Sequence, residues 1–260
     1  MVINFIDYIG SYFLRLINTI SLFVYFLFRT ILTLFTSKLK IKQVIIQLKH
    51  SGAESFSIIF LTGFSAGFAL ALQFYIGLNK FGGEELIGLF VATAMTRELG
   101  PVLTGIMITG RIGSAMAAEI GTMKITEQID ALKTLRINPY QYLIVPRVVA
   151  TTLALPLLTN ISILFGLLGG YIYSTFIVNL NPEIYLSTIE VHVVIWDIIG
   201  GIIKSAFFGF IISIISSFMG FYTKGGARDV GYATTKSVVI GSILILIANY
   251  FLSLLLFRTA

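Results

Sequence analysis

Long apolar runs separated by short polar segments make up most of the chain. A helix needs about 20 apolar residues to cross the hydrocarbon core of a bilayer, which is about 30 Å thick. Five runs reach or exceed that length, at residues 56–78, 86–123, 142–178, 198–222 and 237–257. The pattern predicts an all-α integral membrane protein with about five transmembrane helices.

Residues 5–35 are also apolar, but arginines interrupt them. Arg15 and Arg29 leave 13 residues between them, which is too short to span. We therefore expect an N-terminal helix that lies in the membrane interface. Four lysines follow before the next acid: Lys38, Lys40, Lys42 and Lys49. A basic segment of this kind lies beside anionic headgroups. Residues 1–55 are accordingly predicted to be an interfacial and juxtamembrane segment, and residues 56–260 a polytopic domain.

Two of the runs are too long for one span. Residues 86–123 form a helix of roughly 57 Å if unbroken. This helix must project into the cytoplasm, bend at Pro101, or do both. Residues 142–178 contain Pro146 and Pro156, which predict a re-entrant elbow followed by a span.

Lysine and arginine lie almost entirely on one side of these predicted spans. That side holds eleven of them: Lys38, Lys40, Lys42, Lys49, Lys124, Lys133, Arg136, Arg147, Lys224, Arg228 and Lys236. The other side holds Lys80 and Arg258. The positive-inside rule makes the first side cytoplasmic, or the equivalent side of an organelle membrane, and places the C-terminus outside. The outer loop at 179–197 is acidic, and Trp196 is expected to anchor it at the interface.

The composition supports an integral membrane protein and excludes several other classes of protein and site. Only 12% of the residues are charged and 57% are hydrophobic, against roughly 25% charged in soluble domains. The absence of cysteine excludes disulfides, thiolate metal sites and a cysteine nucleophile. The net charge of +6 reflects the cytoplasmic lysines and arginines, so we expect no nucleic-acid binding. No nucleotide-binding G-x-x-x-x-G-K-[ST] motif occurs, so any energy comes from another chain or an ion gradient.

The run at 86–123 carries charges that a bilayer disfavours. A charge at the centre of a span costs about 2.5–3.5 kcal/mol and needs a partner or a wet cavity. At 100° per residue, Arg97, Arg111 and Glu119 fall on one face of the helix, and Glu98 lies beside it. This face lines a substrate path, or it neutralises itself to fix helix packing. Alternatively, Arg111 and Glu119 lie beyond the hydrocarbon. Lys204, the only charge in its own span, is expected to complete the same polar site.

Small residues recur at helical spacing in two runs. One stripe repeats every four residues: Gly105, Thr109, Gly113, Ala117 and Gly121. Such a stripe lets neighbouring backbones approach closely.

Gly63-Phe-Ser65-Ala-Gly67 matches the nucleophile pattern of serine hydrolases, but it lies inside an apolar helix rather than on a strand-to-helix turn. His50 and His192 lie on opposite sides of the membrane from each other, and neither is placed to serve as a base. A packing face is therefore the better interpretation.

A short amphipathic segment, at 126–138, joins two runs on the cytoplasmic side. Its apolar face consists of Ile125, Ile129, Leu132 and Leu135. Acids precede bases along it, as the helix dipole favours: Glu127, Asp130, Lys133 and Arg136. Thr126 is expected to cap this helix, and Asn138-Pro139 to end it. The helix either lies on the membrane surface or docks into a groove on a soluble partner.

The segment ELGPVLTGIMITGRIGSAMAAEIGTMKITEQIDAL, followed by INPYQYLIVPR, resembles the signature of the MlaE-type permeases of ABC transporters. That family includes bacterial phospholipid-trafficking permeases and plastid lipid-import permeases. The resemblance is strongest from Arg97 to Arg147 and extends over the whole chain. It implies that substrate contacts lie at Arg97, Glu98 and Lys204, with Arg97 on the lipid phosphate and Glu98 holding Arg97 or gating access. Asn249 departs from the family pattern, because some bacterial members have an acid there.

The resemblance also implies partners. Residues 125–139 correspond to the coupling helix, and the residues that would meet an ATPase are Glu127, Ile129, Asp130, Leu132, Lys133 and Arg136. The expected assembly is a permease homodimer with a cytoplasmic or stromal ABC ATPase, which binds the ATP, so that this chain itself needs no cofactor. A substrate-binding protein of the mammalian-cell-entry type is expected on the far side.

The expected function is therefore that of a membrane subunit, not an enzyme. It would move phospholipid or glycerolipid through a cavity at the dimer interface, driven by ATP. The expected location is a bacterial inner membrane or the inner envelope membrane of a plastid (chloroplast), with the plastid favoured. The alternative is an ion-coupled secondary transporter or channel that acts without an ATPase.

Overall fold

The protein is described here by a computed structural model covering residues 2–257, with side chains from residue 13 onward except 15 and 16. The Arg15 side chain and Arg258, used above in the predictions, lie outside the described residues. The described part is helical and contains no strand. In chain order the main helices are α1 (Val2–Thr36), α2 (Ile41–Ser51), α3 (Phe56–Leu78), α4 (Ile87–Ala94), α5 (Gly100–Ile108), α6 (Ser114–Ile125), α7 (Gln128–Thr134), α8 (Val145–Phe176), α9 (Pro182–His192), α10 (Ile195–Phe221) and α11 (Ala227–Phe257). Short turns join several of them: η1 (Ala53–Ser55), η4 (Met95–Leu99), η5 (Thr109–Gly113) and η6 (Tyr140–Ile144).

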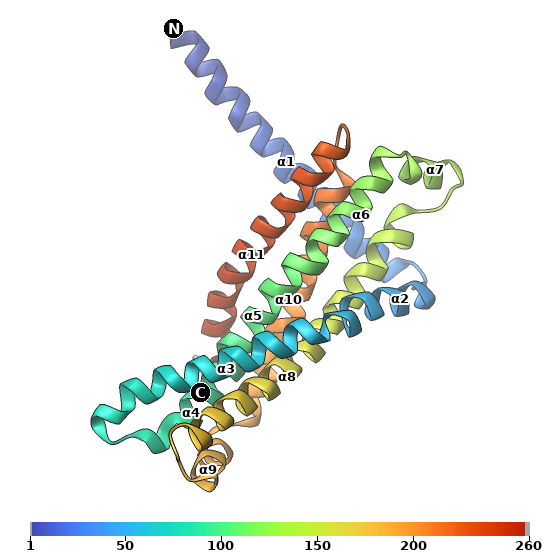
Figure 1. The fold of residues 1–260 in the computed structure, drawn as a ribbon. Coiled ribbons are helices and arrows are strands. Elements are labelled where there is room, and N and C mark those ends of the chain that lie inside the picture. Colours follow the sequence, from blue (N-terminus) through green and yellow to red (C-terminus); the bar gives the residue numbers. More distant parts are fainter. Residues whose placement is uncertain (1, 258–260) are drawn as a thin grey trace.

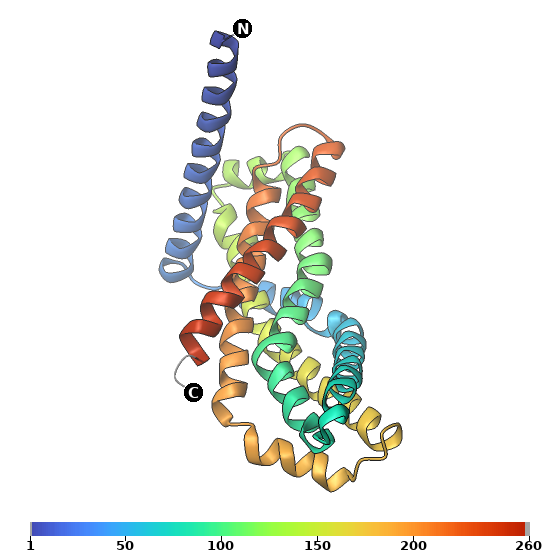
Figure 2. The same cartoon turned by 90° about the vertical axis from the view of Figure 1, so that its left-hand side faces the viewer.

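Within the described residues, six helical segments are long and apolar enough to cross a membrane. Five correspond to the predicted runs, two of them ending one or two residues early, at Phe176 and Phe221, and α3 begins and ends where the pattern predicted. The chain is therefore a multi-pass membrane protein. The sixth segment is Ile17–Thr36 in α1, where the Arg29 Nε donates to the Tyr25 hydroxyl at 2.9 Å. The interfacial placement of the N-terminal helix stays a prediction. Figures 1 and 2 show that the first half of α1 extends away from the bundle.

The ends of the bundle agree with the predicted orientation. In Figure 1, α7 and the connection between α10 and α11 lie at one end, and α9 lies at the other. The first end carries Lys133 and Lys224, two of the residues on the predicted cytoplasmic side. We call it the cytoplasmic end. The α11 helix begins at Ala227, ten residues earlier than predicted, so this last helix projects beyond its apolar run.

The long helix from α4 to α6 runs through Pro101 without ending. Proline has no N–H, and its ring crowds the carbonyl four residues earlier, here that of Arg97. The chain accommodates this with η4, a π turn in which the Gly100 N–H bonds to the Met95 carbonyl. A π turn inside an α-helix often marks a functional site. This one contains Arg97 and Glu98.

The predicted re-entrant elbow is wrong. Residues 145–176 form one helix, α8, preceded by the π turn η6. Pro146 lies in the first turn of α8, where the missing N–H would have no helical partner in any case. Pro156 lies inside the helix. Proline is tolerated there because neighbouring helices and side chains satisfy the freed backbone groups.

The outer segment at 179–197, predicted as a loop, contains a helix. Asn181 caps α9 by accepting from the Glu183 N–H at 3.0 Å, and Pro182 occupies its first turn. Tyr185 anchors α9 to the bundle: it is 1% exposed, and its hydroxyl donates to the Leu167 carbonyl at 3.1 Å. The Asn-Pro-Glu sequence is itself a helix-start signal. The polar composition of the segment favoured a loop, and this is why the prediction was wrong.

Close backbone contacts hold the bundle together, as the small residues predicted. A Cβ added at Gly63 would lie 2.6 Å from the Ser162 carbonyl oxygen, and one at Gly67 would overlap the backbone of Gly166. Thus α3 and α8 cross with their backbones in contact. The glycines of the stripe at 105–121 pack instead against side chains, chiefly those of α10 and α11. For example, a Cβ at Gly113 would lie 3.0 Å from the Ser216 Oγ.

This crossing generates a prediction. Gly67→Val is expected to lower the free energy of unfolding by about 3 kcal/mol, because the added side chain has no room beside Gly166. The matched control is Gly77→Val on the same helix, where a Cβ meets nothing within 4 Å. Thermal unfolding in detergent measures both. Equal melting temperatures for the two variants would contradict the close crossing.

Candidate functional site

Lys204 is fully buried in α10, so its ammonium has to be satisfied by other protein groups. Its Nζ lies 3.0 Å from the Glu98 Oε1 and donates to the Ser253 Oγ at 2.6 Å. It also donates to the Arg97 carbonyl at 2.7 Å. That carbonyl is the one to which Pro101, four residues on, can offer no N–H. Lys204 therefore supplies to the π turn the hydrogen bond that Pro101 cannot supply.

Glu98 is the acceptor at the centre of this cluster. Its Oε1 accepts from Ser253 at 2.8 Å, and its Oε2 accepts from the Asn249 amide at 2.7 Å. The side chain stays 42% exposed, so the carboxylate is held but reachable. An acid at position 249 would place a second carboxylate beside that of Glu98, and the two negative charges would repel each other. The amide donates a hydrogen bond instead, so the departure from the family pattern suits this cluster.

Arg97 pairs with an acid that the sequence analysis did not select. Its Nε donates to the Asp197 Oδ1 at 2.8 Å, and Asp197 is 1% exposed. The expectation that Glu98 holds Arg97 is therefore wrong. Asp197 was assigned to an outer loop, although an acid three residues after the start of an apolar run is a helix-capping signal. Its Oδ2 accepts from the Val194 N–H, which caps α10. The Phe257 ring lies 5.3 Å from the Arg97 Cζ.

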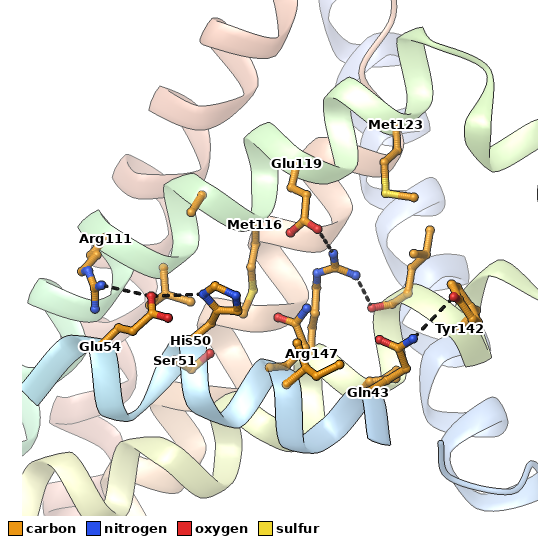
Figure 3. Close-up of a pocket in the computed structure, with 16 residues that line it drawn as sticks. Gln43, His50, Ser51, Glu54, Arg111, Met116, Glu119, Met123, Tyr142 and Arg147 are labelled. Atoms are coloured by element: carbon orange, nitrogen blue, oxygen red, sulfur yellow. Dashed lines mark hydrogen bonds and ion pairs between the residues drawn. The ribbon is translucent and has the colours of Figure 1, made fainter. Parts of the chain in front are cut away.

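The four charges of the long helix do not form one face. Arg111 and Glu119 point toward other elements than Arg97 and Glu98 do. Arg97 and Glu98 lie in the π turn η4 and Arg111 lies in a second π turn, η5, and these turns shift the helical register, so the ideal projection of 100° per residue fails. Arg111 and Glu119 instead line a cavity of about 610 Å³ bounded by α2, α6 and the start of α8 (Figure 3).

The amphipathic helix predicted at 126–138 is present but shorter. The α7 helix covers only Gln128–Thr134, and the residues that flank it, Glu127 and Arg136, have φ of 60° and 59°. Thr126 does not cap it: Glu127 occupies the N-cap position, and no side chain makes a capping hydrogen bond there. The Thr126 hydroxyl instead donates to the Thr122 carbonyl of the preceding helix and accepts from the Gln128 side chain at 3.1 Å.

The two faces of α7 differ. Ile129 is fully buried in the chain's own core, with Leu132 packed against that core, whereas Leu135 is 70% exposed. Asp130 accepts from Lys133 at 2.7 Å and from Lys124 at 2.9 Å. The outer face therefore presents an apolar side chain beside fixed charges.

The pH response of Asp130 is a testable consequence. Hydrogen bonds from Lys133 and then Lys124 lower the pKa of this carboxyl from 3.8 to about 2. Because the pKa is depressed, the pairing stabilises α7 fully above about pH 4 and is lost as the pH falls through about 2. Carboxyl carbon NMR should therefore show a midpoint near 2, moving toward 3.8 in Lys133→Gln. A midpoint near 3.8 in the unmodified chain would contradict the pairing.

Known proteins resemble this chain along most of its length. The family model described as "Permease MlaE" matches residues 44–255. A "Probable ABC transporter permease protein" of Rickettsia typhi is 41% identical over 258 residues, which cover 99% of this chain and 100% of that protein. The chloroplastic protein TRIGALACTOSYLDIACYLGLYCEROL 1 of Arabidopsis thaliana is 38% identical over 232 residues, 89% of this chain and 66% of that protein.

The "Intermembrane phospholipid transport system permease protein MlaE" of Haemophilus influenzae is 31% identical over 259 residues, 99% of each chain. Family match and full-length relatives agree with the resemblance found between Arg97 and Arg147. The multi-pass bundle agrees with a transporter subunit of this family. The chain belongs to the MlaE permease family.

Proposed function

We propose that the chain is the membrane subunit of an ATP-driven lipid transporter, and that phospholipid or glycerolipid passes the cluster of Arg97, Glu98 and Lys204. The observation that carries the proposal is this cluster, in which a fully buried lysine holds a half-exposed glutamate inside the membrane. The Haemophilus relative is named for phospholipid transport, which supports a lipid as the substrate.

The geometry suits a lipid headgroup. Arg97 is 29% exposed and anchored through its Nε by Asp197, so the guanidinium is fixed in place with part of its surface open. Arginine is the side chain best suited to binding phosphate in a fixed geometry. Lys204 has no exposure and serves instead to position Glu98. Arg97 therefore contacts the phosphate, and Glu98 controls the space beside it.

The neighbouring surface suits acyl chains and a second copy. The α11 helix exposes an apolar face next to the cluster: Ile243, Leu246, Ile247, Tyr250 and Leu254. In a homodimer, this face of each copy encloses a path with the charged cluster at its wall. A substrate-binding protein of the mammalian-cell-entry type then meets the dimer at the outer end, near α9.

The energy comes from a cytoplasmic ABC ATPase that docks on α7. This helix lies at the cytoplasmic end, with Leu135 and the charges of Glu127, Lys133 and Arg136 on its exposed side. ATP binding by the partner shifts α7, and α6 carries the shift along the long helix. The alternative, an ion-coupled transporter, needs no such partner, so co-purification of an ATPase separates the two.

Removal of the headgroup contact is the direct test. Arg97→Ala is expected to reduce lipid transfer between vesicles, with the ATPase present, by tenfold or more, since a charged hydrogen bond contributes about 1.5–3 kcal/mol. Glu98→Gln should reduce it as well, because Lys204 then faces a neutral partner. Lys80→Ala, which removes a positive charge from the outer loop, is the matched control. Unchanged transfer in Arg97→Ala, with the ATPase still bound, would overturn the assignment.

Docking on α7 has its own test. Leu135→Asp places a charge on the exposed apolar position of the helix and is expected to abolish co-purification of the ATPase. Leu39→Asp is the control, because Leu39 is also exposed (45%) and precedes α2. Retained binding by Leu135→Asp, at the level of the control, would count against α7 as the docking element.

A further inference from the structure

The cavity of about 610 Å³ is distinct from the Arg97 cluster. Its wall along the long helix runs from Arg111 to Met123, two residues before α6 ends at the cytoplasmic end. Arg111 lies roughly 20 Å from Glu98 along the helix axis. The cavity therefore lies nearer the cytoplasmic end of the bundle than the Arg97 cluster does. Its volume is in the range of ligand sites in proteins, about 300–1,000 Å³.

One wall of the cavity holds an arginine that the protein does not fully satisfy. Arg147 is 4% exposed. Its two terminal nitrogens bond to the Glu119 Oε1 at 2.8 Å and to the Leu143 carbonyl at 2.7 Å. Its Nε is buried with no hydrogen-bond partner among the described residues, and the same is true of the Ser51 Oγ, which also lines the cavity. Unpaired buried donors of this kind are costly and rare.

A second charged group faces the same space. The Arg111 guanidinium donates to the Ser55 Oγ at 2.5 Å and lies 3.6 Å from the Glu54 carboxylate. The His50 ring lies 3.1 Å from the same carboxylate. Figure 3 shows the Arg111–Glu54 and Arg147–Glu119 pairs along the same side of the α2 segment. Positive and negative side chains therefore alternate along the cavity.

Stability alone accounts poorly for this arrangement. Glu119 and Glu54 are 57% and 40% exposed, and half-exposed ion pairs contribute little to folding. Two arginines balanced by two glutamates leave the lining close to neutral, so it does not favour a highly charged free anion. It matches a ligand that carries both charges close together. Apolar side chains complete the lining: Ile46, Ile112, Met116, Met123, Leu143 and Pro146.

We propose that this cavity binds the zwitterionic headgroup of a phospholipid of the cytoplasmic leaflet, with Arg147 and Arg111 on the phosphate diester and Glu119 on the ammonium. Arginine forks are suited to phosphate oxygens, and the Nε of Arg147 is a donor that no group among the described residues takes. Binding here requires no ATP and no partner, so it stands apart from the transport function proposed above.

The test uses the full chain in detergent, in an Arg97→Ala background so that the other cluster contributes nothing. Dihexanoyl phosphatidylethanolamine is titrated, and the rise in melting temperature reports binding to the folded state. Arg147→Gln and Arg111→Gln are each expected to weaken binding at least tenfold. Lys42→Gln removes the same charge from α2 outside the cavity lining and should change nothing. If Arg147→Gln fails to fold, Arg111→Gln, which is 31% exposed, carries the test.

Three further arms identify the ligand chemistry. Dihexanoylglycerol, which lacks the headgroup, and inorganic phosphate are expected to bind at least tenfold more weakly than the phospholipid. Glu119→Gln should weaken binding of phosphatidylethanolamine but not of phosphatidylglycerol, which has no ammonium. Equal binding of inorganic phosphate would assign the cavity to a free anion and overturn the proposal. An unchanged affinity for the phospholipid in both arginine variants would overturn the proposal as well, even if those variants change the oligomeric state.

Discussion

The ammonium of Lys204 is the charge around which the outer half of the bundle is built. A lysine with no exposure inside a membrane helix is tolerated only where protein groups replace water on every side. Here those groups come from the π turn η4 and from α11, through Glu98, the Arg97 carbonyl and Ser253. The requirement fixes three elements relative to one another. It also fixes the carboxylate that remains partly open to the surface.

Proline has a role in this arrangement that composition alone does not suggest. Proline usually breaks a helix. Here Pro101 leaves the Arg97 carbonyl without the N–H that would bond to it from four residues on, and this carbonyl accepts from the buried Lys204. The helix continues because the π turn absorbs the strain. The same turn that tolerates the proline therefore presents Arg97 and Glu98.

The sequence predicted the fold well wherever one strong pattern decided the structure. The apolar runs located the spans, and the glycines at positions 63 and 67 predicted the close crossing, because side-chain size directly limits how near two backbones approach. Prediction failed where two signals competed. Proline suggested an elbow before α8, but Pro146 lies in the first turn of that helix, where its missing N–H has no helical partner to lose.

The candidate site was predicted in part for similar reasons. Lys204 and Glu98 were selected because an isolated charge in an apolar helix needs a partner, and the structure brings them together. Asp197 was missed because it lies at the edge of a polar segment, where an acid looks solvated. The grouping of Arg111 with Arg97 failed because a π turn changes the helical register, and no residue pattern in a single sequence announces such a turn. The cavity beside α2 depends on three segments far apart in the chain, so no local reading could have found it.

The crossing of α3 and α8 has a mechanical consequence. Where glycine leaves a notch in one helix and the backbone of the other fills it, as at Gly67 and Gly166, sliding or rolling would drive carbonyl groups over the next side chain. The two helices therefore resist movement relative to each other and are expected to move as one rigid unit. The α11 helix is joined to the bundle chiefly along one side, with its other face open. The permease thus combines a rigid pair of helices, α3 and α8, with one more loosely attached helix, α11. We expect the largest helix displacements during a transport cycle on the side of α11.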